Sequence, residues 1–126
     1  MKLRRLILMT IAVQIAVSSF WVPSVLAKDA AFDAFWTKFR TALEKNDKEA
    51  IASMTRLPYR SNEKPLNKKE FIAYCDKIFS KKTRDCLLKE KPVQDKTTFS
   101  AFCGEDIYVF EKVKDSYLFT EIGVND

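Results

Sequence analysis

An aromatic stripe at helical spacing dominates the first half of this 126-residue chain. Apolar residues recur in steps of three and four over residues 30–46, and charged residues occupy the positions between them. The members of the stripe are Phe32, Phe35, Trp36, Phe39, Ala42 and Leu43. Side chains with this spacing share one face of an α-helix. The pattern predicts an amphipathic helix whose wide aromatic face must be buried against a second layer.

Two further helices are predicted by their capping residues. Asp47 can cap a short helix that turns Ala50, Ile51 and Met54 inward. Residues 57–65 contain two prolines and are predicted to form a loop. Asn67 and Glu70 then have the spacing of a capping box, which predicts a third helix. The apolar residues of that helix are Phe71, Ile72, Cys75, Ile78 and Phe79.

After residue 83 the pattern changes to short apolar runs separated by turn residues. These runs cover residues 86–88, 97–103, 107–113 and 117–122, and a short hairpin turn at 114–116 separates the last two. Helices followed by strands indicate an α+β fold. We expect N-terminal helices packed on one face of a curved antiparallel sheet, with a meander of about four strands.

The first 27 residues have the three parts of a cleavable export signal. Basic residues come first, a mainly apolar run follows, and Pro23 stands four residues before Ala27, where cleavage is expected. The alternative is a membrane anchor, but Thr10 and Gln14 interrupt the run, which is shorter than the ~20 apolar residues of a span. We therefore expect a signal peptide over 1–27, a single domain over 28–126, and a periplasmic or secreted product that contacts the membrane only during export.

Removal of the signal also changes what the charge implies. The whole chain has 22 Lys and Arg against 17 Asp and Glu, and residues 1–27 contain three of the bases and no acid. The remaining net charge of +2 argues against a nucleic-acid partner. Basic residues cluster locally at Lys77, Lys81, Lys82, Arg84, Lys89, Lys91 and Lys96. Acidic residues are interspersed among them, which is typical of a solvated surface rather than an anion site.

Three cysteines, Cys75, Cys86 and Cys103, lie in the part that is expected to be exported, where disulfides persist. If residues 86–103 form a hairpin that turns near Gln94 and Asp95, Cys86 falls opposite Cys103 and can bridge to it where the pair is not hydrogen-bonded. The alternative pair is Cys75 with Cys86. The first pairing is favoured, because Cys75 faces the core side of its helix and can act there as a small apolar residue. A reactive Cys75 thiol would need an electropositive, partly exposed site.

The chain has no histidine. Nucleophilic triads that depend on histidine are therefore excluded, and the usual ligand of zinc and copper is missing. No phosphate-binding glycine loop is present, and we expect no cofactor and no metal. Asp76, Glu105 and Asp106 could serve as acids or bases, but Glu105 and Asp106 follow Gly104 and are explained more simply by a turn.

Six aromatic residues are candidates for a ligand pocket: Trp36, Phe39, Tyr59, Tyr74, Phe110 and Phe119. Ligand pockets are mostly apolar with a few polar groups. The same residues could instead form the core of a small domain, and helical spacing favours that interpretation.

Two segments, FWTKFRTALEKNDKEAIASMTRLPY and DIYVFEKVKDSYLFTEIGV, together with the capped helix between them, resemble small secreted members of the cystatin-like or nuclear-transport-factor-like α+β superfold. The resemblance covers most of residues 29–123 and implies a long N-terminal helix packed across a curved sheet. This superfold includes ligand binders, isomerases and protein-interaction modules. We find no residue here that matches the acid-base residues of its enzymes.

These observations predict a non-enzymatic periplasmic binding or protein-interaction domain. Its partner would be a small apolar ligand in the concavity of the sheet or a protein of the cell envelope. An inhibitor or immunity-type protein that acts on an envelope enzyme or toxin is one alternative. A small acid-base enzyme on a cone-shaped α+β fold is another, and it would require a buried carboxylate.

Overall fold

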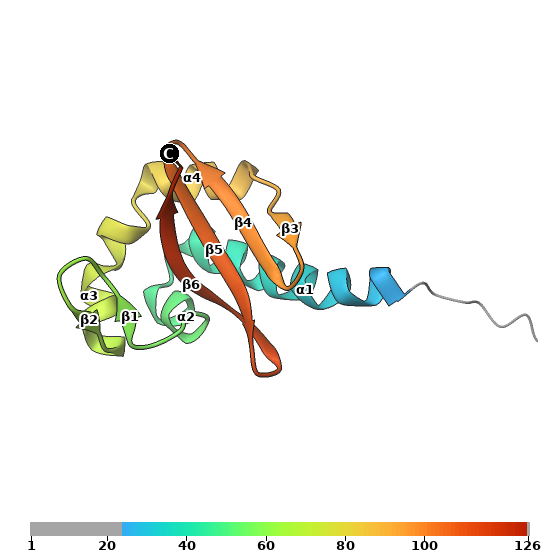
Figure 1. The fold of residues 1–126 in the computed structure, drawn as a ribbon. Coiled ribbons are helices and arrows are strands. Elements are labelled where there is room, and N and C mark those ends of the chain that lie inside the picture. The colour runs from blue at the N-terminus through green and yellow to red at the C-terminus, as the bar shows by residue number, and fades with distance from the viewer. Residues whose placement is uncertain (1–23, 126) are drawn as a thin grey trace, which may run out of the picture.

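The computed structural model describes residues 24–125, and describes side chains from residue 30 onward. The segment 1–27 that is predicted to be the export signal therefore lies mainly outside the described residues. Four helices come first in the chain: α1 (Ser24–Lys45), α2 (Lys48–Ser53), α3 (Lys68–Ile78) and α4 (Lys81–Lys89). A four-stranded antiparallel meander follows: β3 (Val93–Asp95), β4 (Thr98–Cys103), β5 (Asp106–Val113) and β6 (Ser116–Val124). The predicted α+β architecture is confirmed (Figure 1).

Helix α1 crosses one face of the sheet because its aromatic stripe needs a second apolar layer (Figure 1). The ring of Phe32 stacks on Phe99 of β4 with 3.5 Å between ring centroids. Trp36 and Phe39 meet Phe110 of β5 edge to face at 5.3 and 5.2 Å. Edge-to-face and offset aromatic pairs stabilise a core beyond the area that they bury. The hydrophobic core therefore lies between α1 and the sheet.

Two-residue turns join the consecutive strands of the four-stranded sheet. Lys96, Gly104 and Lys114 each occupy the first turn position with a positive φ of 57°, 64° and 57°. A left-handed first residue matches the right-handed twist of the two strands that it joins. The pairs that flank these turns are Asp95 with Thr98, Cys103 with Asp106, and Val113 with Ser116.

A register shift in the last strand pair places one extra residue, Thr120, on β6 opposite the junction of Val109 and Phe110. Thr120 is buried, and its hydroxyl donates a hydrogen bond to the Val109 carbonyl at 3.2 Å. The edge of β6 is partly paired as well, because the Phe119 amide donates to the Met54 carbonyl and the Arg56 amide donates to the Phe119 carbonyl, both at 2.8 Å. Such bulges bend a strand and increase its twist.

Both predicted helix caps are present. The Asp47 carboxylate accepts a hydrogen bond from the Ala50 amide at 3.1 Å and begins α2. Asn67 and Glu70 form a complete capping box at the start of α3, with side-chain to backbone distances of 2.9 and 3.2 Å. These motifs depend on residues close in sequence, so they could be recognised without the fold.

Three local predictions are wrong. Residues 86–88 lie in α4 and not in a strand, because Ser80 caps a helix there and Lys81 and Asp85 form an ion pair one turn apart at 2.9 Å. The β3–β4 turn lies at Lys96 and Thr97, two residues later than expected. The predicted loop 57–65 overlaps two short paired strands, β1 (Tyr59–Arg60) and β2 (Pro65–Leu66).

Candidate functional site

Only one face of the four-stranded sheet packs against helices in the described part of the chain (Figure 1). Cross-strand neighbours point to the same side of a sheet, so the register defines the residues of the other side. Three rows on that side span three or four strands: Phe102, Ile107 and Gly123; Val93, Ser100, Val109 and Glu121; Asp95, Thr98, Glu111 and Leu118. We call these eleven positions the open face.

The centre of the open face is apolar and partly accessible. Phe102 is 42% exposed and Val93 is 58% exposed, whereas Ile107, Val109 and Leu118 are half-buried by their neighbours. The polar residues of the open face are threonine, serine and the acidic residues. A β-rich apolar surface of this kind, bordered by polar groups, is typical of a contact site for another molecule.

The six aromatic residues proposed for a pocket do not lie together. Phe39, Phe110 and Phe119 are fully buried and pack on one another, with ring centroids 5.2 to 6.4 Å apart. Tyr59 is also buried and stacks on Phe119 at 5.7 Å. These four side chains fill the space between the helices and the sheet.

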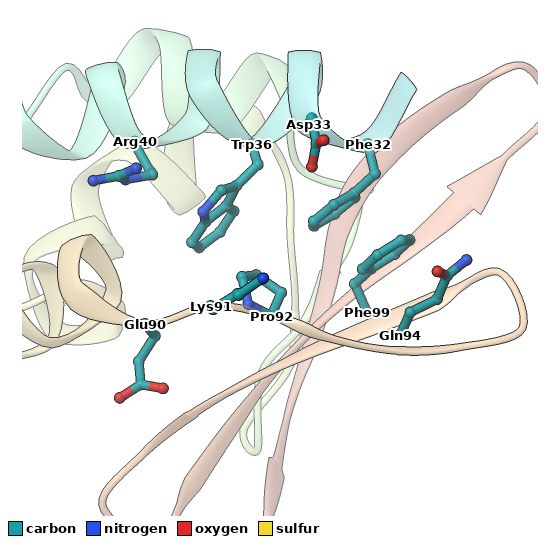
Figure 2. Close-up of a pocket in the computed structure, with 9 residues that line it drawn as sticks. All are labelled: Phe32, Asp33, Trp36, Arg40, Glu90, Lys91, Pro92, Gln94 and Phe99. Carbon is teal, nitrogen blue, oxygen red and sulfur yellow. The ribbon is translucent and has the colours of Figure 1, made fainter. Parts of the chain in front are cut away.

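Trp36 instead contributes to a surface groove between α1 and the segment that leads into β3 (Figure 2). The groove has a volume of about 530 Å³. Its lining residues are Phe32, Asp33, Trp36, Arg40, Glu90, Lys91, Pro92, Gln94 and Phe99. Trp36 is only 8% exposed, and the Arg40 guanidinium already donates to the Leu88 carbonyl at 2.9 Å. The groove therefore offers little free aromatic surface, and its charged rim carries both signs.

A second groove of about 370 Å³ brings Tyr59 and Tyr74 together with residues of the β1 loop and the end of β6. Burial raises the pKa of Tyr59 to about 12. The Lys77 ammonium lies 5.0 Å from the ring centre of Tyr74. Sequence reasoning placed these two tyrosines beside Trp36, but the fold assigns them to a different side of the molecule.

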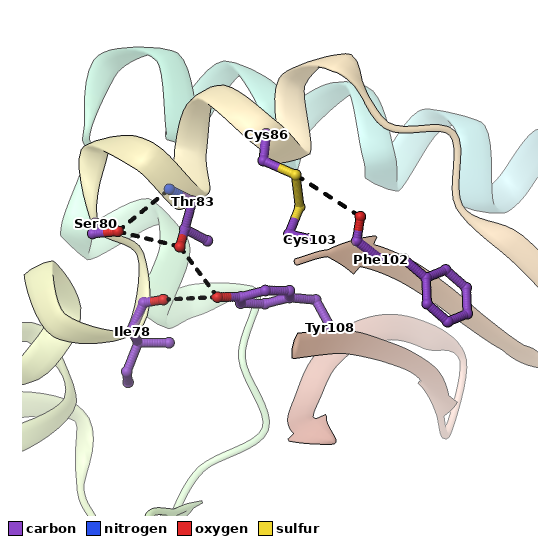
Figure 3. Close-up of a disulfide and its surroundings, with 7 residues drawn as sticks. All are labelled: Ile78, Ser80, Thr83, Cys86, Phe102, Cys103 and Tyr108. Atoms are coloured by element: carbon purple, nitrogen blue, oxygen red, sulfur yellow. Dashed lines mark hydrogen bonds between the residues drawn. A yellow bond between two sulfur atoms is a disulfide. The ribbon is translucent and has the colours of Figure 1, made fainter. Parts of the chain in front are cut away.

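The disulfide joins Cys86 of α4 to Cys103 of β4, with 6.0 Å between the Cα atoms (Figure 3). The favoured pairing is thus present, although Cys86 reaches it from a helix and not from a paired strand. Nearby, the Tyr108 hydroxyl lies 3.3 Å from the Ile78 carbonyl and 3.4 Å from the Thr83 hydroxyl (Figure 3). The Ser80 hydroxyl donates a hydrogen bond to the same Thr83 hydroxyl. Disulfide and hydroxyl network together hold α4 on the sheet.

Cys75 is a free, fully buried cysteine on α3. Burial raises the pKa of its thiol to about 11, so the nucleophilic thiolate is disfavoured. Cys75 therefore acts as a small apolar residue of the core.

The three acidic candidates all lie on the surface and do not converge. Asp76 accepts a hydrogen bond from Lys48 at 2.7 Å, and this partner lowers the pKa of its carboxyl. Glu105 and Asp106 are exposed at the β4–β5 turn. Every Asp and Glu among residues 30–125 is exposed or half-buried. In the same part of the chain no group of three Cys, Asp or Glu side chains is placed to hold a metal.

None of the described helices has the length and apolar character needed to cross a membrane. Comparison of the chain with protein-family models, curated proteins and solved structures finds no match. The open face was not singled out from the sequence. Its signal was the alternation of residues along 106–113, where Tyr108 and Phe110 turn inward and Ile107, Val109 and Glu111 turn outward.

Proposed function

We propose that this protein is an exported, non-enzymatic protein-interaction domain that binds a protein of the cell envelope through the open face. The observation that carries the proposal is the sheet itself: one side is covered by helices and the other presents Phe102 and Val93 to solvent. The disulfide and the predicted export signal at residues 1–27 support the exported location, because disulfides persist outside the reducing cytosol.

A small-ligand binder is supported less well. The aromatic residues that would line an internal pocket are mutually packed, and the grooves lie on the surface. Binding sites for small apolar molecules usually bury most of the ligand. An acid-base enzyme is also supported less well, because such an enzyme needs a carboxylate whose surroundings favour its protonated form. The carboxyl groups of Glu70, Asp76 and Asp85 instead have lowered pKa values, each caused first by a lysine partner.

We also propose that the domain belongs to the cystatin-like superfold. The long helix across a four-stranded antiparallel meander supports this proposal. An inhibitor or immunity-type role is the form of the proposal in which the envelope partner is an enzyme or toxin. That form would be recognised by loss of the activity of the partner on binding.

Site-specific photocrosslinking in the host tests the proposal. A photoreactive phenylalanine derivative would replace Phe102 on the open face or, as the control, Lys69 on the exposed side of α3. We expect a discrete crosslinked product from position 102 and none of the same size from position 69. The double substitution Val93→Ser and Thr98→Lys should weaken the product from position 102 and, because both sites are on the surface, should change the free energy of unfolding by less than about 1 kcal/mol. Equal products from both positions, or none from 102, would contradict the proposal.

A further inference from the structure

We infer that the partner surface that binds the open face is basic, with lysine or arginine side chains surrounding apolar ones. This inference rests on the proposed function and adds the chemical class of the partner. It follows from the position and sign of the charges on the sheet.

The open face carries three carboxylates, from Asp95, Glu111 and Glu121, and none of its eleven positions is lysine or arginine. Asp95 lies on β3 and Glu121 on β6, so two of the carboxylates stand on opposite outer strands with the apolar residues between them. Asp95 and Glu121 are exposed, and Glu111 is half-buried. Protein interfaces commonly have this arrangement, with an apolar centre and a polar rim.

Among the described residues, one base forms an ion pair with this face from outside the sheet. Arg56 lies 3.6 Å from Glu111, with 42% and 34% of the two side chains exposed. The contact is long and solvated, so it offsets the charge of Glu111 only in part. Asp95 and Glu121 remain available to pair with a partner, since neither carboxylate forms an ion pair within 4.0 Å in the described part of the chain.

The charge of the chain is divided between its two layers. Residues 28–91, which contain the helices, have 16 Lys and Arg against 10 Asp and Glu. Residues 92–126, which contain the sheet, have 3 against 7. The helical layer is thus +6 and the sheet layer −4, although the net charge of residues 28–126 is only +2. At physiological ionic strength the Debye length is about 8 Å, so a molecule on the open face senses mainly the negative charges of the sheet.

A second copy of the chain bound face to face does not satisfy this pattern. Such a dimer would place the carboxylates of one open face against those of the other, and like charges oppose association. The area of the open face limits any occupant that contacts this face alone. Four strands about 4.8 Å apart and about six residues long give a face of roughly 400 Å². A stable interface usually buries about 800 Å² on each partner. A partner of opposite charge that also reaches the turns around the face fits better.

Two synthetic amphipathic helical peptides test the sign of the partner: one built from leucine and lysine, the other from leucine and glutamate. Each would be titrated into the isotope-labelled, exported protein while its backbone amide signals are recorded by NMR. We expect the Leu/Lys peptide to shift the signals of β3 to β6 in preference to those of α1 to α4. The Leu/Glu peptide should leave the signals of the sheet unchanged.

Matched substitutions then separate local charge from net charge. The variant Asp95→Asn, Glu111→Gln and Glu121→Gln removes three carboxylates from the open face. The control Asp33→Asn, Glu44→Gln and Glu63→Gln removes three exposed carboxylates elsewhere and changes the net charge equally. We expect the first variant to bind the Leu/Lys peptide at least about tenfold more weakly, and the control to stay within about threefold of wild type. Raising the salt concentration should weaken wild-type binding and have less effect on the first variant.

The outcomes distinguish failure of this inference from failure of the proposed function. Equal binding of both peptides to the sheet, or equal effects of the two triple variants, would overturn the inference and leave the open face as a docking surface. Shifts centred on the helices would also overturn it. Concentration-dependent shifts of the sheet signals without peptide would identify a second copy as the occupant instead. The crosslinking at Phe102 tests the docking surface independently of charge, and its failure alone would refute the proposed function.

Discussion

Gly104 begins the β4–β5 turn with a φ of +64°, and no atom lies within 4 Å of the position that a Cβ would occupy. Substitution by alanine would therefore cause backbone strain and no steric clash. A non-glycine residue in this left-handed region costs about 1–2 kcal/mol. We expect Gly104→Ala to lower the free energy of unfolding by about 1 kcal/mol in urea titration, because the entropy lost by the unfolded chain offsets part of the strain.

Gly123→Ala is the matched control. Gly123 has no positive φ, and its added Cβ would meet the Ile107 Cβ at 3.9 Å, an ordinary contact. Stability should stay equal or rise by up to about 1 kcal/mol. A similar loss in both variants would show that left-handed geometry at Gly104 is not the cause.

Cys75 gives a second prediction at the scale of a single residue. Its thiol is fully buried, and burial, with a smaller contribution from Asp76, raises the pKa to about 11. At pH 8 only about one thiol in a thousand is then ionised, so alkylation of the native protein should be very slow. Mass spectrometry should show one maleimide adduct only after denaturation. Rapid labelling of the folded, unreduced protein would contradict this assignment.

The capping box of α3 can be tested at the scale of one element. The Asn67 side chain accepts a hydrogen bond from the Glu70 amide at 2.9 Å, and the Glu70 side chain accepts one from the Asn67 amide. Loss of such a cap costs about 1 kcal/mol. Asn67→Ala should lower the free energy of unfolding by that amount, whereas Asn67→Asp should retain most of it. Equal losses in the two variants would argue against the cap.

The disulfide links two elements, α4 and β4, and closes a loop with a sequence separation of 17 residues. A loop of about 15 residues is stabilised by roughly 3 kcal/mol through the lower entropy of the unfolded chain. The double variant Cys86→Ser and Cys103→Ser should lose about this much stability in urea. Treatment of wild type with a reducing agent should have a similar effect, and the double variant should not respond to the agent. A response of the variant would point to another cause.

At the scale of the whole molecule, the predicted cleavage position lies within the first turns of α1, so export would shorten this helix. Cleavage after Ala27 would remove residues 24–27 from this helix and leave Phe32, Trp36 and Phe39 in the core. We expect the periplasmic product of the full-length gene to begin at Lys28 and to weigh two hydrogens less than the fully reduced chain. Mass spectrometry without reducing agent measures both quantities. Retention of residues 1–27 would refute the export prediction.

The elements that could be predicted are those whose signals are local. The stripe around Trp36 requires a helix with one buried side, the Asn67 box begins α3 at the expected residue, and the turn at Lys114 closes the last hairpin. Each depends on residues within about one or two helical turns or on one strand pair. Such contacts form with the same partners in nearly any fold that includes the segment.

Cys86 shows where local signals fail. A short apolar run has too few residues to separate the helical period from the strand period, so residues 86–88 were assigned to a strand. The favoured pairing with Cys103 is present although the hairpin from which it was argued does not form, since Cys86 lies in α4. The other premise, a core-facing Cys75, is confirmed. Only the tertiary packing determined that the disulfide joins a helix, α4, to the strand β4.

Sequence alone thus determined most of the helices and strands, the order of helices before the sheet, and the aromatic stripe that must be buried. The tertiary structure decided which aromatic residues meet. Phe39, Phe110 and Phe119 are separated by up to 80 positions in the chain and become neighbours only when α1 crosses the sheet. It also decided that residues 24–125 leave one side of the sheet uncovered and that its carboxylates share that side. Both properties depend on strand register and on the layer opposite, which are contacts between distant residues that no local pattern records.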